Sequence, residues 1–168
     1  MSGWLDERAR NGGIDEIPLP RGTGRLWLCG KHFVGPDPEH VLSRTGAAAI
    51  VCLNERSELL DRYPEYVEWL EANAPNRALW FPVPDLHAPG VAEARGLLAT
   101  LRTRIDEGDG LVVHCGAGIG RAGTVAAGLL VTLGEPLERA LDTVRAHRAM
   151  AGPEAGAQET LLRLLAES

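Results

Sequence analysis

The stretch Val112–Thr124 reads VVHCGAGIGRAGT and decides how the rest of the chain is interpreted. An apolar segment that resembles a buried strand ends at His114, and an apolar helix is expected from Ala122 to Leu133. In open α/β sheets, ligands bind beyond the carboxyl ends of the strands. A helix that begins there presents free N–H groups and the positive end of its dipole to an anion. The stretch therefore predicts an anion-binding loop.

Apolar and amphipathic segments alternate along the rest of the chain. The segments with strand character are 25–29, 47–53, 78–83 and 111–114. The segments with helical spacing are 64–74, 91–107, 136–148 and 154–167. Asp37 and Pro38 supply a helix start and Gly46 a stop, which predicts a further short helix. This order predicts the α/β class, with a mostly parallel sheet flanked by helices.

The length of 168 residues predicts one domain. Residues 1–23 contain glycine and proline without periodicity and predict an irregular N-terminal arm, which leaves 24–168 as the domain. The net charge of −6 disfavours binding to nucleic acid or to an anionic membrane. No secretory signal is expected, and the apolar stretches are too short to cross a membrane.

The cysteines are Cys29, Cys52 and Cys115, which are too few for a disulfide framework and form no C-x-x-C pair. They predict a reducing compartment, and the cytoplasm is the simplest one. The sequence contains no cluster of metal-ligand residues, so we expect neither a metal nor another cofactor.

Two residues give the predicted anion loop a specific chemistry. Cys115 lies where the strand ends, facing helix N–H groups that favour the nucleophilic thiolate form. Arg121 follows six residues later, and its planar fork matches two phosphate oxygens. A lone buried cysteine is usually a core residue. The combined pattern C-x5-R instead predicts a nucleophile at the centre of the loop and a clamp at its rim.

Two other phosphate-binding motifs fit this stretch poorly. The nucleoside-triphosphate loop G-x-x-x-x-G-K-[ST] is absent. The dinucleotide fingerprint requires a third glycine at a spacing that Gly116, Gly118 and Gly120 do not provide. Neither motif explains Cys115 or Arg121.

The run HCGAGIGRAGT resembles the signature H-C-x5-R of the protein tyrosine phosphatase superfamily. The short chain, and a later helix ending VRAHR, are similar to its dual-specificity branch and to the kinase-associated phosphatase group. The resemblance implies a phosphatase fold in which His114 orients Cys115. It also implies a phosphate cradle formed by Gly116, Ala117, Gly118, Ile119, Gly120 and Arg121.

A general acid is needed to protonate the leaving oxygen of a phosphoester. Asp85 lies 30 residues before Cys115 in FPVPDLHAP, between a predicted strand and a helix. An aspartate after proline is often only a turn residue. Its position resembles the acid loop of the family, although Val83 replaces the tryptophan that is usual there. Asp85 is therefore the expected acid, and His87 is the second candidate.

The resemblance assigns weaker supporting roles to other residues. Gln158 matches a glutamine that positions the water of the second step, and Thr124 keeps a hydroxyl near the loop. Ala122 replaces the serine or threonine that usually follows the arginine. Glu55 and Arg56 are expected beside the pocket or as solvated surface charges. A disulfide between Cys52 and Cys115 is a further hypothesis.

The sequence thus predicts a cysteine-dependent phosphatase of tyrosine or dual specificity, with Cys115 as nucleophile, Arg121 as clamp and Asp85 as acid. The expected partner is a phosphorylated protein or a small phosphoester, and the oligomeric state stays open. The alternatives are a pseudophosphatase that binds phosphorylated partners, and a sulfur-transfer or arsenate reductase enzyme.

Overall fold

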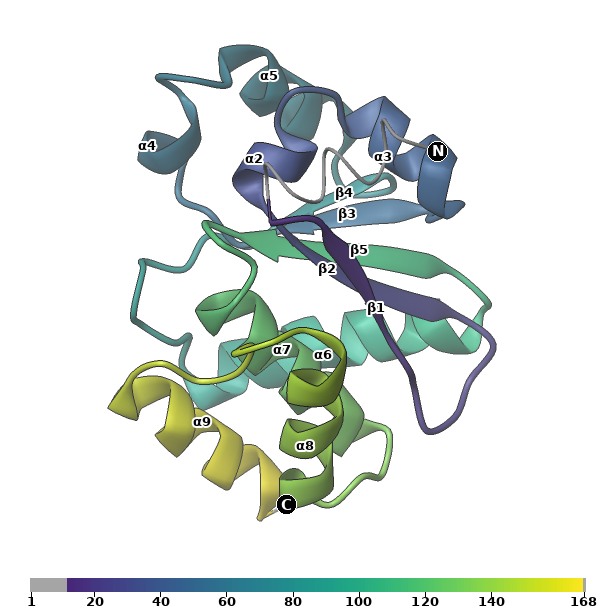
Figure 1. The fold of residues 1–168 in the computed structure, drawn as a ribbon, viewed down its shortest axis with the longest axis vertical. Coiled ribbons are helices and arrows are strands. Elements are labelled where there is room, and N and C mark those ends of the chain that lie inside the picture. The colour runs from purple at the N-terminus through teal and green to yellow at the C-terminus, as the bar shows by residue number, and fades with distance from the viewer. Residues whose placement is uncertain (1–11, 168) are drawn as a thin grey trace.

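The computed structural model describes residues 12–167 and contains a five-stranded sheet in the order β1-β2-β5-β3-β4 (Figure 1). β1 is antiparallel to β2, and the other neighbouring strands are parallel. The mostly parallel α/β fold is therefore confirmed. The strands are β1 Ile14–Ile17, β2 Arg25–Gly30, β3 Ala49–Cys52, β4 Ala78–Trp80 and β5 Gly110–Cys115.

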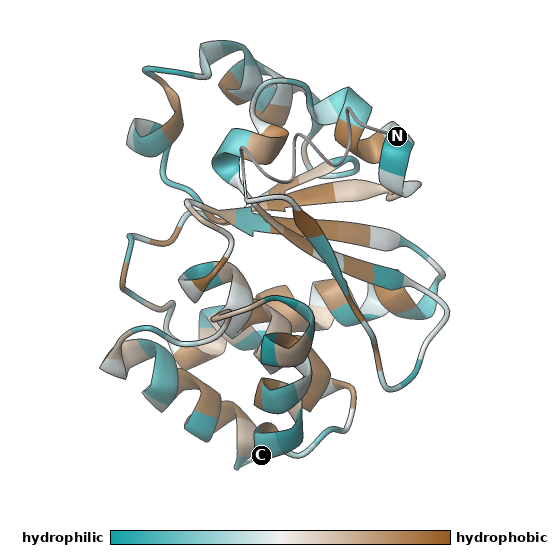
Figure 2. Ribbon diagram, in the orientation of Figure 1, coloured by the Kyte–Doolittle hydropathy of each residue, from teal (hydrophilic) through white to brown (hydrophobic). Residues whose placement is uncertain are grey.

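Helices cover both faces of this sheet (Figure 1). One layer contains α6 Val91–Asp106, α7 Gly120–Thr132, α8 Leu137–His147 and α9 Gly156–Ala166. The other layer contains α2 Lys31–Val34, α3 Pro38–Thr45, α4 Arg56–Leu59 and α5 Pro64–Asn73. Because parallel strands are covered on both sides, they consist almost entirely of apolar residues. Figure 2 shows this concentration of hydrophobic residues on the strands.

The central strand β5 contributes to two separate cores. Leu111, Val113 and Cys115 pack with the α6–α9 layer. Val112 packs with the α2–α5 layer, and His114 reaches Tyr66 of α5 on the same side. This alternation is the period of two that a strand imposes on its side chains. The cysteine therefore lies on the face that carries α7, and the histidine lies on the opposite face.

The start and stop signals of α3 act as the sequence predicts. The Asp37 carboxylate accepts a hydrogen bond of 3.0 Å from the N–H of His40, and Pro38 begins the helix. Gly46 ends it with a φ of 74°, a left-handed conformation that glycine adopts without strain.

The prediction of an irregular arm over residues 1–23 is wrong at residues 14–17, which form β1. Ile14 and Ile17 are its buried residues, and their spacing of three does not show the alternation expected of a strand. Pairing with β2 stabilises β1, although the sequence of β1 does not show the pattern of a strand. Residues 1–11 of the predicted arm lie outside the described residues. The one-turn helices α2 and α4 were also not predicted.

Candidate active site

Cys115 is the last residue of β5, where the strand meets the turn into α7. Its side chain is buried, and the N–H of Ala122 in the first turn of α7 donates to its sulfur at 3.4 Å. The structure thus places the thiol of Cys115 at the N-terminus of a helix, as the sequence predicts.

The carbonyl groups of the loop 116–119 are held by donors outside it. Gly116 O accepts from the N–H of Lys31 at 3.0 Å. Ala117 O and Gly118 O accept from Arg148 at 2.9 and 2.8 Å. In a trans peptide the N–H points away from the carbonyl of the preceding residue. The N–H groups of residues 117–119 therefore turn to the inner side of the loop, which makes it a nest for an anion.

Glycine is required at one position of this loop by both conformation and space. Gly118 has a φ of 74°, and a Cβ atom there would lie 2.3 Å from the carbonyl oxygen of Cys29. A larger residue would push the loop away from β2. The glycine-rich spacing therefore reflects close packing of the loop against the neighbouring strand.

The Arg121 side chain is buried beside the loop and is held by Glu58. Its two Nη atoms donate to the two carboxylate oxygens of Glu58 at 2.7 and 2.8 Å, and Nη1 also donates to Val83 O at 2.8 Å. Burial alone raises the pKa of Glu58. The hydrogen bonds from Arg121, from the Glu55 N–H and from Asn54, with the charge of Arg121, outweigh burial and lower this pKa to about 2.

The Nε atom of Arg121 is buried and has no hydrogen-bond partner among the residues that the structure describes. A buried donor without an acceptor costs about 1–3 kcal/mol. Three of the five N–H groups of Arg121 are bonded to Glu58 and Val83, which leaves the Nε–H and one N–H of Nη2 to bind an anion. This arrangement can bind an additional anion without releasing Glu58.

Asp85 lies in a turn between β4 and α6, and its carboxylate oxygen is 3.6 Å from Nη2 of Arg121. The turn is closed by the N–H of His87, which donates to Pro84 O at 3.0 Å. Leu86 has a φ of 64°, which is a strained value for a residue other than glycine. The structure thus brings Asp85 to Arg121. The ring of His87 is hydrogen-bonded at 2.8 Å to the carbonyl of Asp85.

His114 is fully buried beneath the loop. Its Nε2 atom is 2.6 Å from the hydroxyl of Tyr66, and its Nδ1 atom is 3.4 Å from the carbonyl of Cys115. Burial lowers the pKa of His114 to about 4, so the ring is neutral at pH 7. A neutral ring that donates from Nδ1 and accepts from Tyr66 satisfies both contacts. This contact to the Cys115 backbone fits the supporting role expected of His114.

Gln158 is also buried, and both ends of its amide contact protein backbone. Its oxygen accepts from the N–H of Glu154 at 2.7 Å, and its nitrogen donates to His87 O at 3.1 Å. In this conformation the amide joins the start of α9 to the turn that carries Asp85. Both polar atoms of the Gln158 amide are thus bonded to backbone, and its role in positioning the water of the second step stays a prediction.

Thr124, the other supporting residue, is buried in α7, and its hydroxyl donates to Gly120 O at 2.7 Å. It thus bonds within its own helix and is not directed at the sulfur of Cys115.

The sequence interpretation missed Glu58 and Arg148. Glu58 belongs to α4 and forms a capping box with Glu55. A glutamate three residues after a helix start is the sequence signal that could have identified this short helix. The neighbouring Arg56 pairs instead with Glu71 at 3.1 Å on the surface. Arg148 is the last residue of the run VRAHR, but its role was not predicted because its contacts join segments that are distant in sequence.

The register of β3 contradicts the hypothesis of a Cys52–Cys115 disulfide. Cys52 is aligned with His114, so both side chains lie on the face opposite to Cys115. Leu53 packs in the same core as Cys115 instead. A shift of one residue along a strand moves a side chain to the other face. Burial also raises the pKa of the Cys52 thiol to about 12, which makes it a poor partner in exchange.

The described residues contain no group of three or more His, Cys, Asp or Glu side chains arranged to hold a metal. None of their helices has the length and apolar character required to span a membrane.

Comparisons with solved structures find the same fold in known phosphatases. The crystal structure of Tk-PTP in its active form is 28% identical, with a TM-score of 0.69 over 88% of this chain and 93% of that one. Kinase-associated phosphatase, with its catalytic-site cysteine replaced by serine, is 23% identical, with a TM-score of 0.73 over 92% and 93%. Human DUSP28 is 20% identical, with a TM-score of 0.67 over 90% and 93%. A comparison with curated protein sequences gave no match.

The sequence model of one family, described as the Swiss Army Knife protein, DSP-PTPase phosphatase domain, matches residues 32–166. That range contains the turn with Asp85, the Cys115 loop and Arg121, and it spans most of the chain. The chain therefore belongs to the DSP-PTPase family of Swiss Army Knife phosphatase domains and is a cysteine-dependent phosphatase.

Proposed function

We propose that this phosphatase hydrolyses phosphomonoesters in two steps, with Cys115 as the nucleophile. In the first step its thiolate attacks phosphorus, the bond to the leaving oxygen breaks, and Asp85 gives that oxygen a proton. In the second step water attacks the phosphocysteine, and Asp85 accepts a proton from it. The P–S bond breaks, which releases inorganic phosphate and restores the thiolate.

The observation that carries this proposal is the unused Nε donor of Arg121, which is buried beside a nest of N–H groups. The Nη atoms hold Glu58, so the guanidinium is already oriented when the phosphate arrives. Donors fixed before the reaction stabilise the charge that develops on the phosphoryl oxygens. Asp85 lies 3.6 Å from the same guanidinium, and this proximity supports its role as the acid for the leaving group.

The substrate is proposed to be a phosphorylated protein residue or a small phosphoester. One structural neighbour, PTPMT1, was crystallised with the phosphoinositide PI(5)P, but the identity is only 17%. In this chain Gly116–Gly120 contain no lysine to bind further phosphate groups. The carboxylate of Glu154 also lies against Gly120, where a Cβ atom would be 2.1 Å from its oxygen. This negative charge disfavours a polyanionic substrate.

Because β1 belongs to the sheet, the proposed domain includes residues 14–23 as well as 24–168. It is proposed to function in the cytoplasm, without nucleic acid, membrane or metal. The support for the compartment is chemical, because all three thiols are free and the mechanism needs Cys115 reduced.

The deciding experiment measures turnover of a generic aryl phosphate, with and without EDTA, in the wild type, Cys115→Ser and Arg121→Lys. We expect EDTA-resistant turnover in the wild type and none in Cys115→Ser, which should still bind inorganic phosphate. Arg121→Lys should lose both binding and turnover, because a point charge does not replace the fork. Turnover by Cys115→Ser would overturn the mechanism. Phosphopeptide binding without wild-type turnover would favour a pseudophosphatase, and arsenate reduction would favour the reductase alternative.

A further inference from the structure

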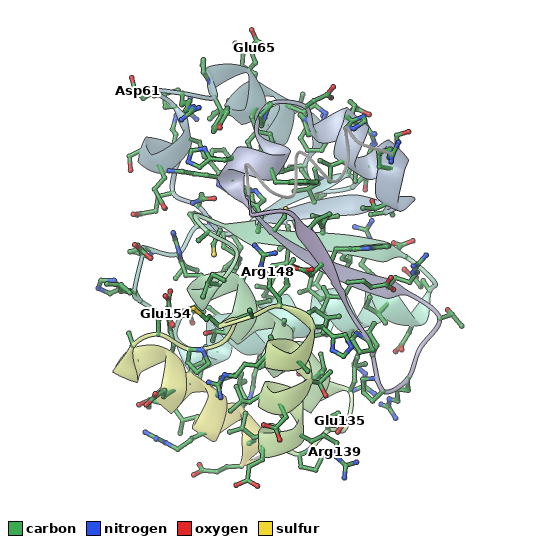
Figure 3. All side chains as sticks on the ribbon, viewed as in Figure 1. Asp61, Glu65, Glu135, Arg139, Arg148 and Glu154 are labelled. Carbon is green, nitrogen blue, oxygen red and sulfur yellow. The ribbon has the colours of Figure 1, made fainter. Side chains whose placement is uncertain are left out.

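Arg148 follows the last residue of α8 (Figure 3). It is almost completely buried, with 5% of its side chain exposed. Its Nε and Nη2 atoms donate to Gly118 O and Ala117 O at 2.8 and 2.9 Å. Its Nη1 atom donates to a carboxylate oxygen of Asp15 at 2.7 Å. One guanidinium therefore binds the outer side of the catalytic loop and the N-terminal strand at the same time.

The two carbonyls that Arg148 holds belong to the peptides that carry the N–H groups of Gly118 and Ile119. Since a trans peptide is planar, fixing the carbonyl outward fixes the N–H inward. Without the guanidinium these two carbonyls would lose their charge-assisted partner, and the peptide planes could rotate. Arg148 thus sets the direction of two donors of the phosphate nest without reaching the phosphate itself.

Asp15 sets the position of Arg148 in turn. It lies on β1, where its side chain shares a face with Ile17, the β1 residue that packs in the α6–α9 core. The guanidinium of Arg148 donates to two carbonyls of the loop and to one carboxylate. These three contacts fix it in a single orientation. The family match begins at residue 32, so β1 and Asp15 lie outside it, whereas the loop and Arg148 lie inside it.

We infer that Arg148 is a positioning residue for phosphate binding and that Asp15 makes β1 a working part of the active site. This inference rests on the proposed function of the Cys115 loop. Its consequence is that a change on β1, remote in sequence from the loop, alters anion affinity. Loss of one charge-assisted hydrogen bond in the nest lowers affinity by about 10- to 100-fold.

The test compares Arg148→Lys and Asp15→Asn with Glu16→Gln, a matched control. Glu16 is the next residue on β1 and forms an exposed ion pair with Arg25 at 2.6 Å. The readouts are kcat/KM with an aryl phosphate and the inhibition constant of inorganic phosphate, measured well below each variant's melting temperature. The inhibition constant reports the nest geometry of folded molecules, which a loss of stability alone does not change.

We expect phosphate inhibition to weaken by about 10- to 100-fold in Arg148→Lys, by less in Asp15→Asn, and not at all in Glu16→Gln. The double variant should be hardly worse than Arg148→Lys, since both changes act through one contact. Wild-type inhibition constants in folded Arg148→Lys would overturn the inference. If Arg148→Lys does not fold, a wild-type inhibition constant in Asp15→Asn would overturn the inference. An inactive Cys115→Ser in the same series would show that the phosphatase mechanism stands even if this inference fails.

Discussion

The substitution Glu58→Gln tests whether the Arg121 clamp depends on a carboxylate. Both oxygens of Glu58 accept from Arg121, at 2.7 and 2.8 Å. In glutamine one of these oxygens becomes an NH2 group, which would face a guanidinium N–H as donor against donor. At least one of the two hydrogen bonds must break, and the clamp loses its fixed orientation.

The size of the effect follows from the pKa of Glu58, which lies at about 2 instead of the ordinary 4.5. That difference corresponds to about 3 kcal/mol. Because 21% of the side chain is exposed, solvent screening reduces the expected contribution to about 2 kcal/mol. Since the folded pKa is below the unfolded one, this stabilisation is complete above pH 4.5 and is lost as the pH falls toward 2.

We therefore expect Glu58→Gln to lower the unfolding free energy at pH 7 by about 2 kcal/mol, and the difference from wild type to shrink below pH 4. Loss of clamp geometry should lower kcat/KM by about 10- to 100-fold. Urea unfolding at several pH values and steady-state kinetics measure the two effects. Glu71→Gln, which breaks the exposed pair with Arg56, is the control and should change neither. A Glu58→Gln enzyme that is less stable but has unchanged kcat/KM would refute the reasoning.

Three further predictions concern the chemistry at Cys115. Asp85→Asn should slow turnover by a factor of about 10²–10⁴ and remove the basic limb of the pH–rate profile. A variant that keeps this limb would show that His87, and not Asp85, is the general acid. Peroxide should leave Cys52 and Cys115 unlinked in peptide maps, because they lie on opposite faces of the sheet; a Cys52–Cys115 disulfide would contradict this register. Ala122→Ser should raise kcat by about 10-fold with less effect on kcat/KM, and the wild type should show a burst of released alcohol. An Ala122→Ser enzyme with unchanged kcat, and a wild type without a burst, would show that phosphocysteine hydrolysis is not rate-limiting.

The parts of the fold that local physics determines were predictable from the sequence. α3 is bounded by Asp37, Pro38 and Gly46, and each of these residues acts in the structure as its type suggests. β5 and α7 were predicted because apolar runs of different length adjoin a glycine-rich turn. β1 could not be predicted, because four residues paired with β2 have no periodicity of their own.

The same distinction explains the active site. Cys115 is the last residue of β5 and Arg121 lies in the first turn of α7, and one short loop joins them. Their closeness in the sequence therefore predicts their closeness in space. Asp85 was predicted from the resemblance of its position to the acid loop of the family. In the structure it follows β4, whose carboxyl end lies at the same edge of the sheet as that of β5. Glu58 lies 63 residues before Arg121, in a one-turn helix without a strong pattern. Its contact is set by tertiary packing, which a single sequence does not express.

Arg121 and Arg148 are held in the same way, because each is fixed by a carboxylate from a segment that is remote in sequence. Glu58 fixes Arg121 on the inner side, and Asp15 fixes Arg148 on the outer side. A guanidinium loses less freedom per hydrogen bond when its fork is already oriented, so each carboxylate lowers the entropic cost of ordering the site. Glycine loses more conformational freedom on folding than any other residue, so a glycine-rich loop is costly to order. We therefore attribute the rigidity that phosphate binding needs to these two ion pairs more than to the C-x5-R sequence itself.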